Sequence, residues 1–126
     1  MKKSKVLVVE DEKDLNDAYF TILSSVGYDV TTAFNGQEAL DQIEKAGDPN
    51  LILLDLRMPI MDGIGFLEKY QSVKHPKTSI ILFSNYEAHK EVDTAFKLGV
   101  ERYILKSLAS PKELLRIVES TLADRG

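Results

Sequence analysis

Short apolar runs recur at even intervals along the chain and predict a set of buried strands. They begin near Lys5, Tyr28, Leu51, Ser79 and Arg102. Three of them, residues 5–9, 51–54 and 79–83, are almost continuous in Val, Ile, Leu and Phe and do not alternate with polar residues. Continuous runs of this length are typical of strands covered on both faces, as in a parallel sheet.

Helical patterns fill the intervals between these runs. An apolar stripe with helical spacing comprises Leu15, Ala18, Tyr19, Ile22, Leu23 and Val26, and Gly27 follows it as a C-cap. Two capping-box spacings predict the starts of a second and a last helix: Asn35 with Glu38, and Ser110 with Glu113. A third helix is predicted from about residue 63 to 72. A fourth ends at Gly99 and is predicted to bury Val92, Ala95 and Phe96.

Strand and helix therefore alternate five times, which predicts an α/β domain with a parallel sheet and right-handed crossovers. We expect residues 1–126 to form this single domain, because the sequence shows no linker and no output domain after the last helix. Ligands of such sheets bind beyond the carboxyl ends of the strands. The residues that follow each strand are therefore the ones that decide the function.

Composition excludes several classes of protein. The 126 residues include no cysteine, which rules out a disulfide scaffold and thiol chemistry. The formal net charge is −4, which argues against a general nucleic-acid surface. No apolar run approaches the length of a membrane span or of a secretory signal. We therefore expect a cytoplasmic protein that binds neither nucleic acid nor membrane directly.

Polar residues with complementary chemistry follow four of the five predicted strands. They are Glu10 and Asp11, then Asp55, then Ser84, and finally Lys106. Three carboxylates that meet at one sheet edge repel one another unless a cation lies among them, and oxygen ligands of this kind suit Mg²⁺. A lysine and a hydroxyl beside a carboxylate nucleophile are what phosphoryl transfer to an aspartate requires.

Each of these signals has an ordinary alternative when it is taken alone. An acidic turn is usually a solvated loop, Asp55 can be a turn former or N-cap, and Ser84 with Asn85 fits a turn. Lys106 alone fits a surface lysine, and His75 is predicted to be a solvated loop residue. The coincidence of the set at four strand ends favours a common site.

Three segments identify a family. Val6-Leu7-Val8-Val9-Glu10-Asp11-Glu12, Leu53-Leu54-Asp55-Leu56-Arg57-Met58-Pro59 and Met61-Asp62-Gly63 closely resemble the signature segments of response-regulator receiver domains. The resemblance runs from Lys5 to about Leu122. It implies a flavodoxin-like, doubly wound (βα)5 domain with strand order 2-1-3-4-5 and helices on both faces.

The resemblance also implies roles for the acids. Asp55 would be the phosphoacceptor of a two-component phosphorelay. Asp11, Asp55 and the backbone carbonyl of Arg57 would bind Mg²⁺ directly, and Glu10 would hold the ion through water. The implied donor is the phosphohistidine of a sensor kinase or phosphotransfer protein, so the chain would be a phosphoacceptor and not a turnover enzyme.

Further roles concern the response to phosphorylation. Lys106 would bind the phosphoryl group, and Ser84 would be the switch hydroxyl that moves toward it. Tyr103 would be the aromatic residue that turns inward when Ser84 moves. Without the resemblance, Tyr103 is equally well interpreted as a half-buried packing residue. The face around Tyr103 carries Lys90, Lys97, Arg102 and Lys112. It would bind a downstream partner or form a homodimer.

Some positions depart from the family pattern. Ser107 follows Lys106 where the family usually has proline. A cis bond there costs about 2.5–4 kcal/mol without proline, so the loop either bears that cost or places Lys106 differently. The resemblance implies that Arg57, Asn85 and Tyr86 influence access to the acceptor. We hypothesise that bulk at Asn85 and Tyr86 screens the phosphate from water and lengthens the phosphorylated lifetime.

Three other functions fit parts of the pattern. A Mg²⁺-dependent phosphatase commonly has a second acid two residues after its nucleophile, where this chain has Arg57. A flavin-binding protein needs a phosphate loop rich in Gly, Ser and Thr, where this chain has the acidic residues 10–14. The main alternative is a receiver-like interaction module that is not phosphorylated, for which Ser107 and Asn85 leave room.

Overall fold

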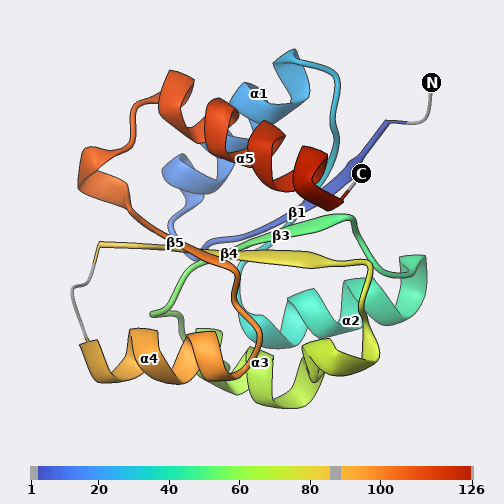
Figure 1. The fold of residues 1–126 in the computed structure, drawn as a ribbon, viewed down its shortest axis with the longest axis vertical. Coiled ribbons are helices and arrows are strands. Elements are labelled where there is room, and N and C mark those ends of the chain that lie inside the picture. The colour runs from blue at the N-terminus through green and yellow to red at the C-terminus, as the bar shows by residue number, and fades with distance from the viewer. Residues whose placement is uncertain (1–2, 86–88, 126) are drawn as a thin grey trace.

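The computed structural model describes residues 3–85 and 89–125, in which strands and helices alternate along the chain (Figure 1). The elements are β1 (Lys5–Val9), α1 (Lys13–Ser25), β2 (Asp29–Ala33), α2 (Gly36–Ala46), β3 (Leu51–Leu54), α3 (Gly63–Tyr70), the 3₁₀ turn η1 (Ser72–Lys74), β4 (Ser79–Ser84), α4 (His89–Lys97), β5 (Arg102–Leu105), the 3₁₀ turn η2 (Lys106–Leu108) and α5 (Pro111–Arg125). None of the helices described is both long and apolar enough to cross a membrane.

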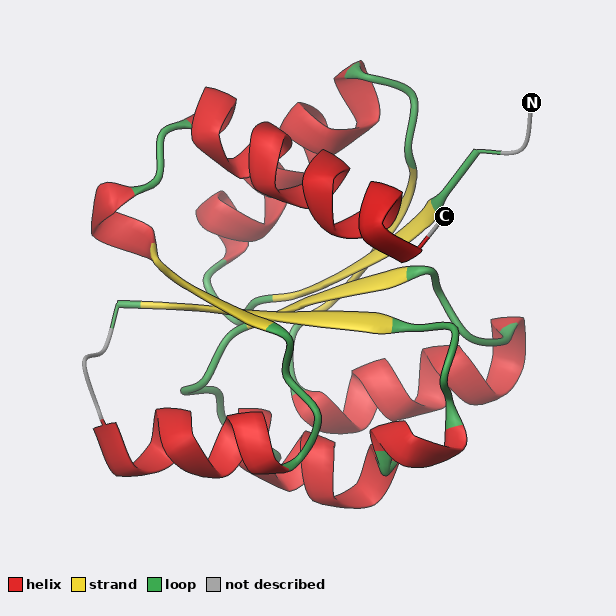
Figure 2. Cartoon of the chain, in the orientation of Figure 1, coloured by secondary structure: helices red, strands yellow, loops and turns green. Residues whose placement is uncertain are grey.

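The strands form one parallel sheet in the order β2-β1-β3-β4-β5. Helices α1 and α5 cover one face of this sheet, and α2, α3 and α4 cover the other (Figure 2). The order and the two helical layers confirm the predicted doubly wound fold. All strands are parallel, so their carboxyl ends lie at the same edge, where the predicted site residues follow them.

The central strands divide their side chains between two cores. Val6 and Val8 of β1 point into the core under α1 and α5, whereas Leu7 and Val9 point into the core under α2, α3 and α4. The same alternation holds along β3 and β4. Because successive side chains of a strand point to opposite faces, a continuous apolar run is what a strand covered on both faces requires.

The predicted caps start their helices. The Asn35 side chain accepts a hydrogen bond from the Glu38 amide at 2.9 Å, and the Ser110 hydroxyl accepts one from the Glu113 amide at 3.2 Å. In a complete capping box the Glu113 carboxylate would also accept a hydrogen bond from the Ser110 amide. Here that carboxylate pairs with Arg116 instead.

Three details of the predicted helices are wrong. The third helix ends at Tyr70, before residue 72, because Gln71 adopts a left-handed conformation with φ 55°. The buried stripe of α1 contains Asn16, Tyr19 and Leu23, while Ala18 and Val26 are exposed. Phe96 is 43% exposed, although Ala95 beside it is buried. A helix buries only a narrow stripe, so a small error in its phase moves a predicted core residue to the surface.

Candidate functional site

The carboxyl ends of β1 and β3 hold the first site residues through backbone hydrogen bonds. The Glu10 amide donates to the Ala33 carbonyl at 3.0 Å, and the Asp55 amide donates to the Val9 carbonyl at 3.0 Å. Both residues thus continue the ladder of the sheet beyond the last strand positions. Backbone bonds to the buried residues Ala33 and Val9 therefore fix the positions of Glu10 and Asp55.

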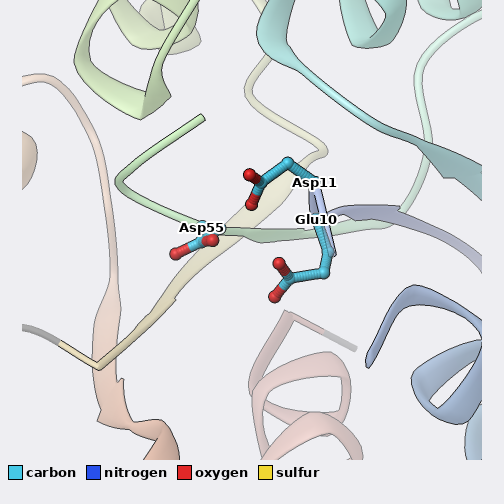
Figure 3. Close-up of side chains that lie close together, drawn as sticks. All are labelled: Glu10, Asp11 and Asp55. Atoms are coloured by element: carbon cyan, nitrogen blue, oxygen red, sulfur yellow. The ribbon is translucent and has the colours of Figure 1, made fainter. Parts of the chain in front are cut away.

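Three carboxylates meet at this edge, as predicted. One oxygen each from Glu10, Asp11 and Asp55 lies within 4.8 Å of the others, and Figure 3 shows the three side chains around a common space. Glu10 is 2% exposed and Asp55 is 8% exposed, whereas solvent reaches Asp11. Like charges this close repel, and a hard divalent cation coordinated by oxygen relieves that repulsion. The donor set therefore fits Mg²⁺.

Lys106 supplies a positive charge to the same acids. Its ammonium group pairs with Glu10 and lies 3.3 Å from Oδ2 of Asp55, and its side chain is only 7% exposed. The group also lies 5.9 Å from the centre of the Phe83 ring, a distance at which cation–π attraction operates. No cis peptide bond occurs among the described residues. Lys106 therefore reaches the acids with a trans bond to Ser107.

Burial dominates the electrostatics of Glu10. Desolvation raises the pKa of its carboxyl group, and the negative charge of Asp55 raises it further. Hydrogen bonding and attraction from Lys106, with a hydrogen bond from the Glu12 amide, lower it. Burial prevails, and the pKa of Glu10 is about 7. Near neutral pH this acid is therefore protonated in a substantial fraction of the molecules.

The loop after Asp55 leaves one of its carboxylate oxygens directed toward Lys106. Oδ1 accepts a hydrogen bond from the Leu56 amide at 2.8 Å, while Oδ2 is the atom near Lys106. The loop closes where the Gly63 amide donates to the Leu56 carbonyl at 2.9 Å. A Cβ atom on Gly63 would lie 2.6 Å from the Asp55 carbonyl oxygen, so only glycine fits there.

The predicted switch residues occupy neighbouring strands. Ser84 ends β4 with no exposed surface, and Tyr103 is half-buried on β5. In the β4–β5 register Ser84 faces Leu105, two residues after Tyr103. Asn85 follows β4 and is exposed. Tyr86 lies outside the described residues.

The backbone and the side chain of Arg57 have different neighbours. Its backbone belongs to the loop that follows the acceptor, as the sequence predicts. Its guanidinium group forms an ion pair with Glu91 of α4. Sequence spacing gives no indication of this pair, because many acids lie within reach of a long arginine side chain.

Asn16 is a functional neighbour that the sequence analysis missed. It is 1% exposed, and its amide group donates to the backbone carbonyls of Glu10 at 2.9 Å and Ala33 at 3.2 Å. It thereby joins the ends of β1 and β2 beneath the acids. Its spacing could have revealed it: Asn16 lies three residues before Tyr19 and seven before Leu23, which places this polar residue on the buried face of α1.

Known proteins share this arrangement. Residues 6–119 match the family described as "Response regulator receiver domain". A probable transcriptional regulator ycf27 from Porphyridium aerugineum is 39% identical over 122 residues, which cover 97% of this chain and 49% of that protein. The chain thus spans about half the length of the ycf27 relatives it matches. Chemotaxis protein CheY1 from Helicobacter pylori is 35% identical over 93% of this chain and 98% of its own length.

Solved structures agree with the sequence relatives. A CheY-like response regulator receiver domain protein from Methanospirillum hungatei JF-1 superposes with a TM-score of 0.91 at 28% identity, covering 98% of this chain and 97% of its own. Chemotaxis response regulator CheY4 of Vibrio cholerae gives 0.84 at 26% identity, covering 94% and 98%. The family match, the fold and the cluster of Glu10, Asp11 and Asp55 agree, and this chain belongs to the response regulator receiver domain family.

Proposed function

We propose that this chain is a phosphoacceptor of a two-component phosphorelay, in which Asp55 receives a phosphoryl group from a histidine in a Mg²⁺-dependent reaction. The observation that carries this proposal is the convergence of Glu10, Asp11, Asp55 and Lys106 at one edge of the sheet. The proposed donor is a sensor histidine kinase or a phosphotransfer protein.

The transfer is a substitution at phosphorus. Oδ2 of Asp55 forms a bond to phosphorus while the bond from phosphorus to the imidazole nitrogen of the donor breaks. The electron pair of that bond returns to the nitrogen. Such transition states are loose, so positioning and charge compensation contribute most of the catalysis. The Leu56 amide holds Oδ1 of Asp55 at 2.8 Å and fixes the orientation of the nucleophile.

Asp11, Asp55 and the backbone carbonyl of Arg57 would hold the Mg²⁺ ion, with Glu10 bound through water. When bound, the ion supplies positive charge that offsets the charge of the acids and of the incoming phosphoryl group. The ammonium group of Lys106 would pair with the phosphoryl oxygens; its distance of 3.3 Å from Oδ2 of Asp55 supports this role.

The output would pass through Ser84 and Tyr103. Phosphorylation replaces the single negative charge of the Asp55 carboxylate by the nearly two negative charges of a phosphoryl group, and a buried hydroxyl near them is drawn to donate a hydrogen bond. Tyr103 lies on the adjacent strand and packs partly against the core under α2, α3 and α4. Its movement would alter the face of α4, β5 and α5, where we place the downstream partner or a second copy.

Residues 1–126 would act as one receiver domain in the cytoplasm, without turnover of a diffusible substrate. The proposed lifetime of the phosphoryl group depends on Asn85 and Tyr86. If these side chains screen it from water, Tyr86→Ala shortens the half-life of the phosphorylated protein. An unchanged decay rate in that variant removes the screening role of Tyr86.

Intact-mass spectrometry with phosphoramidate and MgCl₂ tests the main proposal. Wild-type protein is expected to gain one phosphoryl group, and EDTA is expected to prevent the gain. Asp55→Asn removes the nucleophile and should gain none, whereas Asp41→Asn, an exposed acid on α2, should behave as wild type. If wild type gains no mass and also fails to bind beryllofluoride, the unphosphorylated interaction module is the better description.

A further inference from the structure

Ile60 stands out in the loop that follows the acceptor. Its backbone has φ 68°, a region that β-branched residues seldom adopt. The Met61 amide donates to the Pro59 carbonyl at 2.7 Å across it. This is a three-residue γ-turn with a positive central φ, which is the rare and strained form of that turn.

The side chain of Ile60 is also exposed to an unusual degree. It is 84% exposed and belongs to neither hydrophobic core of the described chain. Glycine or asparagine would adopt this backbone with less strain. Isoleucine therefore adds backbone strain at this position, and its side chain gains no burial within the described chain.

The loop that carries Ile60 is fixed in place. The Met61 carbonyl accepts a hydrogen bond from the Gly36 amide at 2.8 Å, which ties the loop to the start of α2. Met61 also packs on Gly36 so closely that a Cβ atom there would lie 2.8 Å from its side chain. Ile60 is consequently held at the surface and cannot fold back onto the domain without breaking these contacts.

Ile60 lies on the loop that leads from Asp55 to α3, on the route by which a protein donor would approach the acceptor. Asp55 is only 8% exposed, so a donor histidine has to enter between the loops at this edge to reach it. The protein surface around that histidine would then face the acceptor loop. Phe34, which is 37% exposed, lies on the adjoining loop two residues before Gly36. The loop of Ile60 is thus hydrogen-bonded to the start of the helix that Phe34 precedes.

Charge on the other side of the acceptor defines the remainder of the partner surface. Asp11, Glu12 and Asp14 follow β1 with solvent access, so this part of the rim is negative. A complementary donor has basic groups facing these acids and an apolar patch facing Ile60. Complementary charge speeds encounter, while burial of an apolar anchor slows dissociation.

We infer that Ile60 is a specificity-determining contact that docks into an apolar patch beside the phosphohistidine of the donor protein. The inference rests on the proposed phosphorylation of Asp55. It assigns to Ile60 no role in the chemistry itself, since the side chain is an exposed hydrocarbon. A donor too small to touch Ile60 should therefore transfer its phosphoryl group regardless of the residue at this position.

Phosphotransfer rates from two kinds of donor test the inference. The protein donors are autophosphorylated cores of the histidine kinases of the same organism, and the one that phosphorylates wild type fastest is used for the variants. The small donor is phosphoramidate. Ile60→Asn is expected to lower kcat/KM from the kinase about tenfold, the effect of losing one buried aliphatic side chain, and to leave the phosphoramidate rate within about twofold.

Two further variants complete the design. Ile60→Gly removes the side chain and relaxes the turn, so its loss of kinase transfer should match Ile60→Asn while its melting temperature does not fall. Val73→Asn is the matched control, because Val73 is 85% exposed on η1 at the opposite edge of the sheet. It should transfer at the wild-type rate from both donors.

Wild-type kinase transfer in both Ile60 variants overturns the inference. So does equal slowing with the kinase and with phosphoramidate, which would mean that Ile60 positions the acceptor. So does a wild-type chain that reacts with phosphoramidate but with none of the kinases. Failure of wild type to react with phosphoramidate is a different result, because it removes the proposed function itself.

Discussion

The ammonium group of Lys106 lies between two buried carboxylates: it pairs with Glu10 and is 3.3 Å from Oδ2 of Asp55. One cation therefore offsets part of the charge of two acids that are almost withdrawn from water. This arrangement makes Lys106 important for stability before any phosphoryl group arrives.

Replacement of Lys106 by methionine is expected to destabilise the Mg²⁺-free protein. The variant keeps most of the side-chain volume but leaves the two acids without their partner, which for a buried pair costs about 3 kcal/mol. Urea denaturation in EDTA measures the change. Lys97→Met, an exposed lysine on α4, is the control. Equal unfolding free energies for Lys106→Met and wild type would show that the pair contributes nothing.

The affinity for Mg²⁺ is expected to depend on pH through Glu10. Burial raises the pKa of Glu10 to about 7 in the absence of a cation, so below that pH the group carries a proton that the ion must displace. Affinity should therefore rise with pH up to about 7 and change little above it.

Isothermal titration calorimetry in buffers of different ionisation enthalpy reports the protons released. Release should be clear at pH 6 and small at pH 8. Glu10→Gln removes the ionisable group and should flatten this part of the profile. Proton release that is the same at both pH values in wild type would contradict the assignment.

Gly63→Ala is expected to disturb the acceptor loop. The added methyl group would lie 2.6 Å from the Asp55 carbonyl oxygen and 3.1 Å from the Cα atom of Leu56, and backbone atoms cannot turn away. We expect a loss of about 2 kcal/mol in unfolding free energy and slower phosphorylation by phosphoramidate. Gly65→Ala is the matched control, because its Cβ atom would meet the flexible Met61 side chain at 3.1 Å. Equal stability of the two variants would contradict this prediction.

Asp48, Tyr70 and His75 form a second polar cluster, and a substitution there should lower stability without affecting phosphorylation. Asp48 accepts a hydrogen bond from the Tyr70 hydroxyl at 3.0 Å and pairs with Nδ1 of His75 at 2.7 Å, and the His75 ring stacks on Tyr70 with centroids 4.1 Å apart. These residues lie at the amino ends of the strands, away from Asp55. Asp48→Ala should lower the unfolding free energy by about 1–2 kcal/mol and leave the phosphoramidate rate unchanged.

The double variant Asp48→Ala/Tyr70→Phe should lose less than the sum of the two single variants, because both remove the same hydrogen bond. Additive losses would mean that the bond has no measurable free energy. A slower reaction of Asp48→Ala with phosphoramidate would show that the two edges of the sheet are coupled.

Much of the fold could be predicted from the sequence because it depends on residue periodicity. The continuous apolar run of residues 51–54 is typical of a strand covered on both faces, which it forms. Asn35 and Ser110 cap helices through contacts within a few residues. The site could be anticipated for the same reason: Asp11, Asp55 and Lys106 follow strands whose parallel direction fixes the edge they share.

Other features depend on contacts that no local pattern encodes. His75, predicted to be solvated, is 27% exposed because Asp48 and Tyr70, distant in sequence, surround it. Arg57, on the loop after β3, pairs with Glu91 of α4, and only the folded surface determines which acid the long arginine side chain meets. Phe96, predicted to be buried, is exposed, because the spacing of apolar residues does not show that Ala95, and not Phe96, faces the core.

The backbone bonds that continue β1 and β3 into the site have a consequence for motion. The amides of Glu10 and Asp55 donate to the carbonyls of Ala33 and Val9, two buried residues at the carboxyl ends of β2 and β1. Their hydrogen exchange should therefore require separation of β1 from β2 or from β3, and not only movement of the loops that follow these strands. The backbone of the acceptor is thus anchored to the sheet, and the surrounding loops are left to rearrange around a fixed point.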